Sequence, residues 1–176
     1  MAGSPLADDR CLLSLGSNMG ERLKALQEGV SRLAARGVTP LAASSVYETE
    51  PVEGAVGQRP FYNACLLCTT GLSALQLLEA AKGVERELGR TAGPRHAPRP
   101  LDVDILLVGS ATLSLPGLEV PHRQLARRRF VLIPALELCP DLVLPDGKPL
   151  ATALAELPPW EEEVVFAHPP AALVGR

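Results

Sequence analysis

Two aspartates separated by a single residue are the feature of this chain that most directly suggests chemistry. Asp102 and Asp104 lie in the apolar run 101–108, which is bounded by Gly109 and has the character of a strand. Because successive side chains of a strand point to opposite faces, both carboxylates should leave the same face. Magnesium usually takes one or two protein carboxylates together with phosphate oxygens of a substrate. The pair is therefore a candidate magnesium site, and a solvated sheet face carrying two acids is the alternative.

Basic residues surround this pair in the sequence. Residues 82–99 and 122–130 hold nine of the 17 Lys and Arg residues of the chain. The segment 91–100 contains three prolines and cannot form regular structure, so Arg90, Arg95 and Arg99 can gather around a phosphate chain held at the aspartates. Farther along the chain, His122 and Arg128 are further residues that could bind an anion. These clusters predict a local anion site, and the alternatives are a solvated basic loop and a structural histidine.

Length, composition and charge place the chain among globular proteins of one domain. It has 176 residues, of which 47% are hydrophobic and 21% charged, with a formal net charge of −3. This balance does not predict binding to nucleic acid or to an anionic membrane. No apolar run approaches the roughly 20 residues of a membrane span, and residues 1–10 include two aspartates where a signal peptide would be apolar. We therefore expect a cytoplasmic protein that binds a small anionic ligand.

The four cysteines predict buried, reduced thiols rather than a disulfide framework. Cys65 and Cys68 have CxxC spacing, but they belong to an apolar run with strand character, in which residues three apart face opposite ways. The spacing therefore argues against a zinc or redox role. The other two cysteines are Cys11 and Cys139.

The elements that must position the charged residues follow from hydrophobic periodicity. The run 11–15 predicts a strand that ends in a turn at 16–18, and helical spacing predicts a helix over 21–36 that Gly37 ends. Two strands, 44–49 and 61–70, should follow, with the loop 50–60 between them. Ser73 and Gln76 form a capping box for a second helix that ends at Gly89, and the strand 101–108 comes last.

The resulting order, βαββαβ, is that of the ferredoxin-like arrangement. We expect an α+β fold with a mostly antiparallel sheet and helices packed on one face. Beyond residue 109 the pattern is weaker: 130–138 is a helix or a strand, Asp146 and Gly147 predict a tight turn, and 150–157 predicts a short helix. Residues 10–157 are then one domain, and 158–176 have the composition of a C-terminal tail.

Several short motifs occur in an order that resembles one known family, the 6-hydroxymethyl-7,8-dihydropterin pyrophosphokinases of folate biosynthesis. The resemblance covers residues 11–157, and its most specific part is the arginine and Asp-x-Asp stretch followed by Val-Pro-His. The motifs are Leu15-Gly16-Ser17-Asn18, Tyr47-Glu48-Thr49-Glu50-Pro51, Phe61-Tyr62-Asn63, Glu85 with Leu88-Gly89-Arg90, Pro98-Arg99-Pro100-Leu101-Asp102-Val103-Asp104-Ile105-Leu106, and Val120-Pro121-His122 before Arg128 and Phe130.

The resemblance implies a transferase that moves the β,γ-pyrophosphoryl group of ATP to the hydroxymethyl group of the pterin and releases AMP. It implies two magnesium ions held by Asp102 and Asp104. It also implies that Arg90 and Arg99 contact the phosphates and assist the transfer. The residues that the resemblance places at ATP are Glu85, Arg90, Arg99, Ile105, His122 and Arg128.

The pterin, by the same resemblance, lies between the rings of Phe61 and Phe130, with Asn63 at its polar edge. A flat heterocycle gains from contact with aromatic faces, and an amide offers both a donor and an acceptor. The alternative is that both phenylalanines belong to the hydrophobic core. The residues implied for the pterin are Thr49, Val52, Phe61, Asn63, Asp102 and Phe130. Because every motif ends before residue 158, we expect the tail to be dispensable for catalysis.

The chain departs from the family pattern mainly around the arginine loop. His96, Ala97 and Pro100 replace the residues common there, the segment 90–99 is about one residue short, and Glu50 and Arg123 are also unusual. Two alternatives to the transferase therefore stay open: a noncatalytic nucleotide-binding regulator on the same fold, and a metal-dependent phosphohydrolase. No Gly-x-x-x-x-Gly-Lys-Ser/Thr or Gly-x-Gly-x-x-Gly phosphate loop is present.

Overall fold

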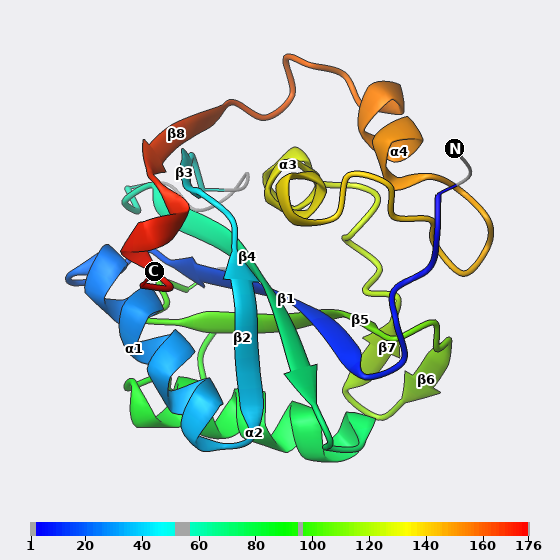
Figure 1. Ribbon diagram of the computed structural model, residues 1–176. Coiled ribbons are helices and arrows are strands. Elements are labelled where there is room, and N and C mark those ends of the chain that lie inside the picture. Colours follow the sequence, from blue (N-terminus) through cyan, green and yellow to red (C-terminus); the bar gives the residue numbers. More distant parts are fainter. Residues whose placement is uncertain (1–2, 52–56, 95–96, 176) are drawn as a thin grey trace.

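A computed structural model of the chain describes residues 3–51, 57–94 and 97–175. Its centre is a six-stranded antiparallel sheet in which β1 (Arg10–Ser17) lies between β4 (Phe61–Thr70) and β5 (Asp102–Val108) (Figure 1). The order β5-β1-β4-β3-β8 ends with β3 (Val46–Thr49) and β8 (Val164–His168), and β2 (Val38–Ala43) also pairs with β4. The expected ferredoxin-like fold is confirmed, since its four strands correspond to β1, β2 with β3, β4 and β5.

The second strand of this pattern is broken into two, and the expected strand 44–49 captured only its latter part. β2 was missed because Pro40 interrupts its apolar pattern, although a proline is tolerated where a strand needs no ladder donor. At the break, Ser44 Oγ accepts the Cys65 N–H at 2.8 Å, and Glu137 Oε1 accepts the Ser45 N–H at 2.9 Å. Side chains thus replace the missing ladder bonds at this point.

Two helices cover one face of the sheet, as the periodicity predicts. α1 (Arg22–Ala35) and α2 (Ala74–Glu87) pack there on Leu13 and Leu15 of β1. The capping box of Ser73 and Gln76 is formed. Gly37 and Gly89 follow the helix ends with φ of 85° and 92°, a conformation that glycine adopts without steric penalty.

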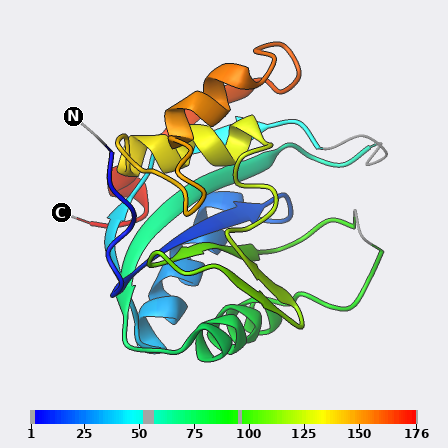
Figure 2. The same ribbon diagram turned by 90° about the vertical axis from the view of Figure 1, so that its right-hand side faces the viewer.

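The opposite face is also covered, so the expectation of helices on one face only was wrong. α3 (Arg129–Leu138) and α4 (Leu150–Glu156) pack there on Leu12 and Cys65 (Figure 2). The segment 130–138 is therefore a helix. Because side chains alternate along a strand, Cys65 and Cys68 point into the two different cores, as expected from their spacing.

The remaining elements lie outside the ferredoxin-like pattern. β6 (Leu113–Leu115) and β7 (Leu118–Val120) form a hairpin that the sequence did not predict. Beyond residue 157, β8 joins the sheet through β3, and a 3-10 turn, η1 (Pro170–Ala172), follows it. This part of the expected tail is therefore integral to the sheet. Within the part of the chain that the structure describes, no helix has the length and apolar character needed to cross a membrane.

Candidate active site

Asp102, the first residue of β5, forms ion pairs with two arginines. Its Oδ1 lies 2.6 Å from Arg90 Nη1, and its Oδ2 lies 3.0 Å from Arg99 Nη1. Arg90 comes from the end of α2 and Arg99 from the loop before β5, so the fold brings together what the sequence only placed nearby. The three side chains are about three-quarters buried, with exposed fractions of 22% to 25%. Two cations thus converge on one carboxylate beside an open cavity.

Glu85 on α2 contacts both Arg90 and the backbone of β5. The side chain is 2% exposed, and its Oε1 accepts the Val103 N–H at 2.8 Å and lies 2.7 Å from Arg90 Nη1. Its Oε2 lies 3.3 Å from Lys82 Nζ. Burial raises the pKa of Glu85, while the Val103 N–H and the two cations oppose that rise. The carboxylate is therefore a fixed link between α2, β5 and Arg90.

Asp104 is the more open of the two aspartates, with 42% of its side chain exposed and His122 Nε2 3.8 Å from its Oδ1. Removal of water by the surrounding protein, followed by the charge of Asp102, raises the pKa of Asp104 to about 7. Burial and then the charge of Arg123 lower the pKa of His122. Because Nδ1 of this imidazole accepts the Gln124 N–H at 3.1 Å, the proton of the neutral ring is on Nε2, facing Asp104. A cation or another donor would stabilise this carboxylate.

A glycine on β1 separates Asp102 from a second polar group. Gly16 pairs with Asp102 on one side and with Asn63 on the other, so all three positions face the side of the sheet covered by α3. A Cβ at Gly16 would lie 3.2 Å from Asn63 Oδ1 and 3.7 Å from a Phe61 ring carbon. Asn63 Nδ2 donates to Thr49 Oγ1 at 2.7 Å, and both residues are buried. The glycine leaves room for a defined amide and an aromatic ring next to Asp102.

Asn18 joins the turn after β1 to the two loops that border the site. Its side-chain Oδ1 accepts the Arg99 N–H at 2.8 Å, and its own N–H donates to the Arg99 carbonyl at 3.2 Å. Its Nδ2 donates to Gln58 Oε1 at 3.0 Å. Figure 2 shows that the chain entering β4 and the chain leaving α2 lie at the same end of the sheet. One buried side chain thereby fixes both loops.

Two hollows meet at this end of the sheet. The larger, of about 890 Å³, lies between the sheet and α3 and is lined by Thr49, Arg99, Asp104, His122, Arg128 and Phe130, among others. The smaller, of about 340 Å³, lies between α2 and the β6–β7 hairpin, and its lining includes Leu78, Lys82, Ile105 and His122. Asp104, His122 and Arg123 line both. A ligand with two parts could therefore occupy both hollows and pass Asp104 where they meet.

Phe130 and Arg128 form the wall of the larger hollow at the beginning of α3. The guanidinium carbon of Arg128 lies 5.4 Å from the centroid of the Phe130 ring, within the range of a cation–π contact. Arg128 Nε also lies 2.9 Å from Oε1 of Glu162, which comes from the segment between α4 and β8. The wall therefore depends on a residue far away in the sequence.

The structure brings most of the expected site residues together. Asp102, Arg90, Arg99 and Glu85 form one cluster, and Ile105 lies in the smaller hollow beside His122. Val52, and Arg95 and His96 of the arginine loop, lie outside the described residues. Lys82 and Arg123 were expected only as members of the basic clusters, without individual roles. Nothing in the sequence pointed to Glu162.

The two aspartates fit a magnesium site that is completed by a substrate. Within residues 3–51, 57–94 and 97–175, no group of three or more His, Cys, Asp or Glu side chains is arranged to hold a metal ion. Magnesium, however, usually takes only one or two protein carboxylates and completes its shell with phosphate oxygens and water. Asp102 and Asp104 face the same side of β5. Desolvation and then the charge of Asp102 raise the pKa of Asp104, so a cation bound there would stabilise its charged form.

Comparison with known proteins identifies what this chain is similar to. Residues 12–140 match a sequence model of the 7,8-dihydro-6-hydroxymethylpterin-pyrophosphokinase (HPPK) family. A 2-amino-4-hydroxy-6-hydroxymethyldihydropteridine pyrophosphokinase of Pseudomonas aeruginosa is 41% identical over 150 residues, covering 85% of this chain and 92% of that protein. The Bacillus subtilis protein of the same name is 41% identical over 128 residues, covering 72% and 76%.

Solved structures agree on the fold. A Plasmodium falciparum HPPK-DHPS superposes with a TM-score of 0.66 at 12% sequence identity, over 88% of this chain. A second HPPK-DHPS, crystallised with substrates, gives a TM-score of 0.63 at 12% identity over 83%. The chain spans 43% of each of these longer proteins. At such low identity the likeness concerns the fold alone.

Proposed function

Because this chain belongs to the 7,8-dihydro-6-hydroxymethylpterin-pyrophosphokinase family, we propose a division of that family's reaction among its residues. The chain is a pyrophosphokinase of folate biosynthesis: it transfers the pyrophosphoryl group of ATP to the hydroxymethyl group of 6-hydroxymethyl-7,8-dihydropterin and releases AMP. The family match favours this activity over a noncatalytic regulator or a phosphohydrolase. The observation that supports the division best is that two hollows meet at Asp104 and His122.

ATP occupies the smaller hollow in this proposal. Ile105 and Leu78 offer apolar surface to the base, and His122 lies at the junction toward Asp104. Arg90, Arg99 and Arg128 receive the phosphate oxygens, since guanidinium groups bind phosphate in a paired, directional way. Glu85 acts through Arg90, which it holds at 2.7 Å.

The pterin occupies the larger hollow. Phe130 on α3 lines this hollow and gives one aromatic face. Phe61, the first residue of β4 and a neighbour of Gly16, would give the second. Asn63 supplies hydrogen bonds to the polar edge of the ring, and its own orientation is fixed by Thr49 at 2.7 Å. Asp102 faces the same side of the sheet as this amide, with Gly16 of β1 between the two. Val52 belongs to this group by the resemblance, outside the described residues.

Two magnesium ions would be held by Asp102 and Asp104. When bound there, they supply positive charge that neutralises the phosphate oxygens and helps to align the pyrophosphoryl group. Hydrogen bonds from Arg90 and Arg99 to Asp102 orient that carboxylate without using all of its lone pairs.

The protein contributes positioning and electrostatics to the reaction. Phosphoryl transfer passes through a state whose charge is spread over phosphate oxygens, and little covalent assistance is required. Arg99 is fixed through its backbone by Asn18, so its guanidinium can face the developing charge with little reorganisation. The stacked and hydrogen-bonded pterin keeps its hydroxymethyl oxygen in line with the phosphorus. The protein acts as a monomer in the cytoplasm in this proposal.

An assay with ATP, magnesium and the hydroxymethyl pterin tests the function. The expected products are AMP and pterin pyrophosphate in equal amounts, formed only when all three components are present. AMP or ADP released without the pterin would support the phosphohydrolase instead. Nucleotide binding without turnover would support the regulator. Sedimentation of the same preparation checks that the active species is a monomer.

A further inference from the structure

Glu162 links the C-terminal segment to the wall of the larger hollow. Its Oε1 lies 2.9 Å from Arg128 Nε, and its Oε2 accepts the Arg129 N–H at 2.8 Å. Its side chain is only 20% exposed. One carboxylate thus holds the side chain of one residue and the backbone of the next.

This contact is made where α3 needs an acceptor. The first N–H groups of a helix have no partner within the helix, and α3 has no side-chain cap of its own at Arg128. A carboxylate at a helix N-terminus is also favoured by the helix dipole. Glu162 therefore fixes the first turn of α3, which carries Phe130.

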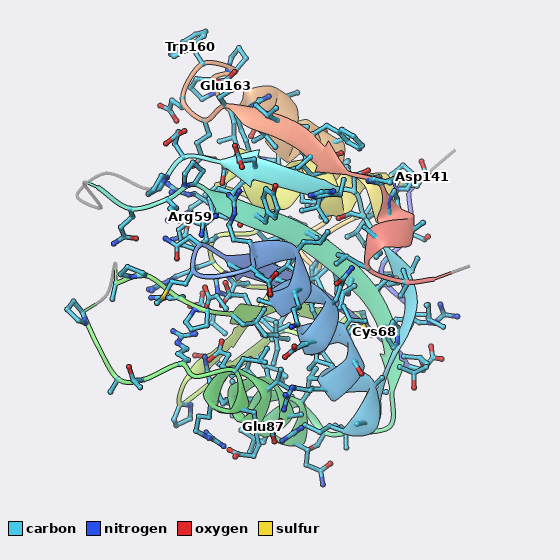
Figure 3. All side chains as sticks on the ribbon, turned by 90° about the vertical axis from the view of Figure 1, so that its left-hand side faces the viewer. Arg59, Cys68, Glu87, Asp141, Trp160 and Glu163 are labelled. Atoms are coloured by element: carbon cyan, nitrogen blue, oxygen red, sulfur yellow. The ribbon has the colours of Figure 1, made fainter. Side chains whose placement is uncertain are left out.

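The segment that delivers Glu162 is anchored on both sides. Before it, α4 packs on α3 through the buried residues Leu150 and Ala153. After it, β8 pairs with β3, whose last residue is Thr49. Figure 3 shows Trp160 and Glu163 on the turn that leads into β8. The anchoring makes the position of Glu162 a property of the fold and not of a loose tail.

We propose that Glu162 is a positioning residue for the pyrophosphoryl transfer: its carboxylate holds Arg128 toward the phosphates and Phe130 toward the pterin. This inference rests on the proposed function. A guanidinium has five N–H donors, so the ion pair with Glu162 leaves Arg128 able to bind a phosphate oxygen as well. Without the carboxylate, Arg128 can turn onto other anions and the first turn of α3 can fray, which displaces both groups at once.

The inference argues against the expectation that residues 158–176 are dispensable. That expectation rested on the absence of recognisable motifs beyond residue 157. A single carboxylate on an anchored segment has no motif, yet it reaches the cavity through Arg128. Removing the segment would remove the acceptor of Arg129 and the strand β8 together.

The kinetic test compares Glu162→Gln with Glu156→Gln, a variant that loses the same charge from an exposed residue of α4 that does not line either hollow. A displacement of about 1 Å at a positioning group costs about a hundredfold in rate. We therefore expect kcat/KM of Glu162→Gln to fall by about tenfold or more, with raised KM for both ATP and the pterin, and Glu156→Gln to stay near the unchanged protein. An unchanged kcat/KM of Glu162→Gln per folded molecule would overturn the inference. Equal losses in both variants would indicate long-range charge and would overturn it as well.

A double-mutant cycle tests whether Glu162 acts through Arg128. Arg128→Gln alone should lower kcat/KM, and adding Glu162→Gln to it should cost less than Glu162→Gln costs in the unchanged protein, because only the bond to the Arg129 N–H then remains to be lost. Additive losses would contradict the proposed route. If the unchanged protein itself fails to make pterin pyrophosphate, the proposed function fails and the cycle is not reached.

Trp160 provides a readout that does not need activity. It is the single tryptophan of the chain, it is 81% exposed, and it lies two residues before Glu162. Loosening of the segment in Glu162→Ala should lower its fluorescence anisotropy, while Glu161→Ala should not. A fall of the same size in Glu161→Ala would assign the effect to lost charge beside Trp160 and would count against the inference.

Discussion

Asn18 and Arg99 are joined by two hydrogen bonds that involve the backbone of the arginine and both the backbone and the side chain of the asparagine. The Arg99 N–H reaches Asn18 Oδ1 at 2.8 Å, and the Asn18 N–H reaches the Arg99 carbonyl at 3.2 Å. Asn18 is 2% exposed. A loop that contains prolines is therefore fixed at Arg99, whose guanidinium reaches Asp102.

Replacing Asn18 should release this loop. Asn18→Ala leaves the buried Arg99 N–H without its acceptor, and we expect a loss of about 1 to 3 kcal/mol in unfolding free energy together with a lower kcat/KM. Asn18→Asp keeps the acceptor for Arg99 but replaces the donor to Gln58 and Arg59 with a buried charge, so it is the control for the kinetic effect and not for stability. Thermal melts and steady-state kinetics of both variants check this. Equal kinetic losses in the two would contradict a specific role for the Arg99 bond.

Arg99→Ala should slow the transfer far more than it weakens ATP binding. If the fixed guanidinium faces charge that develops in the transition state, its loss costs about 2.7 to 4 kcal/mol in kcat, as for other preorganised donors. Single-turnover rates and a direct measurement of ATP affinity separate the two effects. A loss confined to affinity would give Arg99 a binding role only. Arg86→Ala, which removes an exposed arginine paired with Glu79, is the control.

The two aspartates should respond oppositely to substitution in the metal-free protein. Asp102 is paired with Arg90 and Arg99, so Asp102→Asn should destabilise by about 1 to 3 kcal/mol. The pKa of Asp104 is about 7 in the folded protein, above its ordinary value of 3.8, so its ionised form opposes folding. Asp104→Asn should therefore stabilise by on the order of 1 kcal/mol, a small gain because the side chain is partly exposed and solvent screens its charge.

The pH dependence of that gain has a defined sign. Below about pH 4 Asp104 is protonated in both states, so Asp104→Asn should have no effect there. The gain should grow from about pH 4 to 7 and stay constant above. Thermal melts in the presence of a chelator over this range measure it. Both variants should lose magnesium-supported AMP formation, and normal turnover in both at ordinary magnesium would refute the two-aspartate site.

Gly16→Ala should impair the pterin side of the site and spare the ATP side. The new Cβ would lie 3.2 Å from Asn63 Oδ1, and Asn63 is held by its hydrogen bond to Thr49. We expect a loss of about 1 to 3 kcal/mol in stability from overpacking, with a raised KM for the pterin and an unchanged KM for ATP. Gly71→Ala, where a Cβ has open space, is the matched control. A raised KM for ATP alone would contradict the assignment of Asn63.

The sequence by itself determined the ferredoxin-like core and the chemical character of the site. Alternation and helical spacing are local properties, so β1, β4, β5, α1 and α2 could be predicted from periodicity, and the capping box from two residues. Local alternation also placed Asp102 and Asp104 on one face. The order of several short motifs indicated the family, because each motif is made of only a few neighbouring residues.

Only the tertiary structure decided which distant groups act together. The position of Glu162 beside Arg128 depends on β8 pairing with β3, a contact between segments more than 100 residues apart that no local pattern encodes. The break between β2 and β3 is stable because Glu137 of α3 accepts the Ser45 N–H, which is again a long-range contact. Likewise, the burial of Glu85 beneath Arg90 and the meeting of two hollows at Asp104 follow from packing of α2, α3 and the β6–β7 hairpin on the sheet. Periodicity determines which face of a helix or strand a side chain lies on, whereas tertiary packing determines which residues that face contacts.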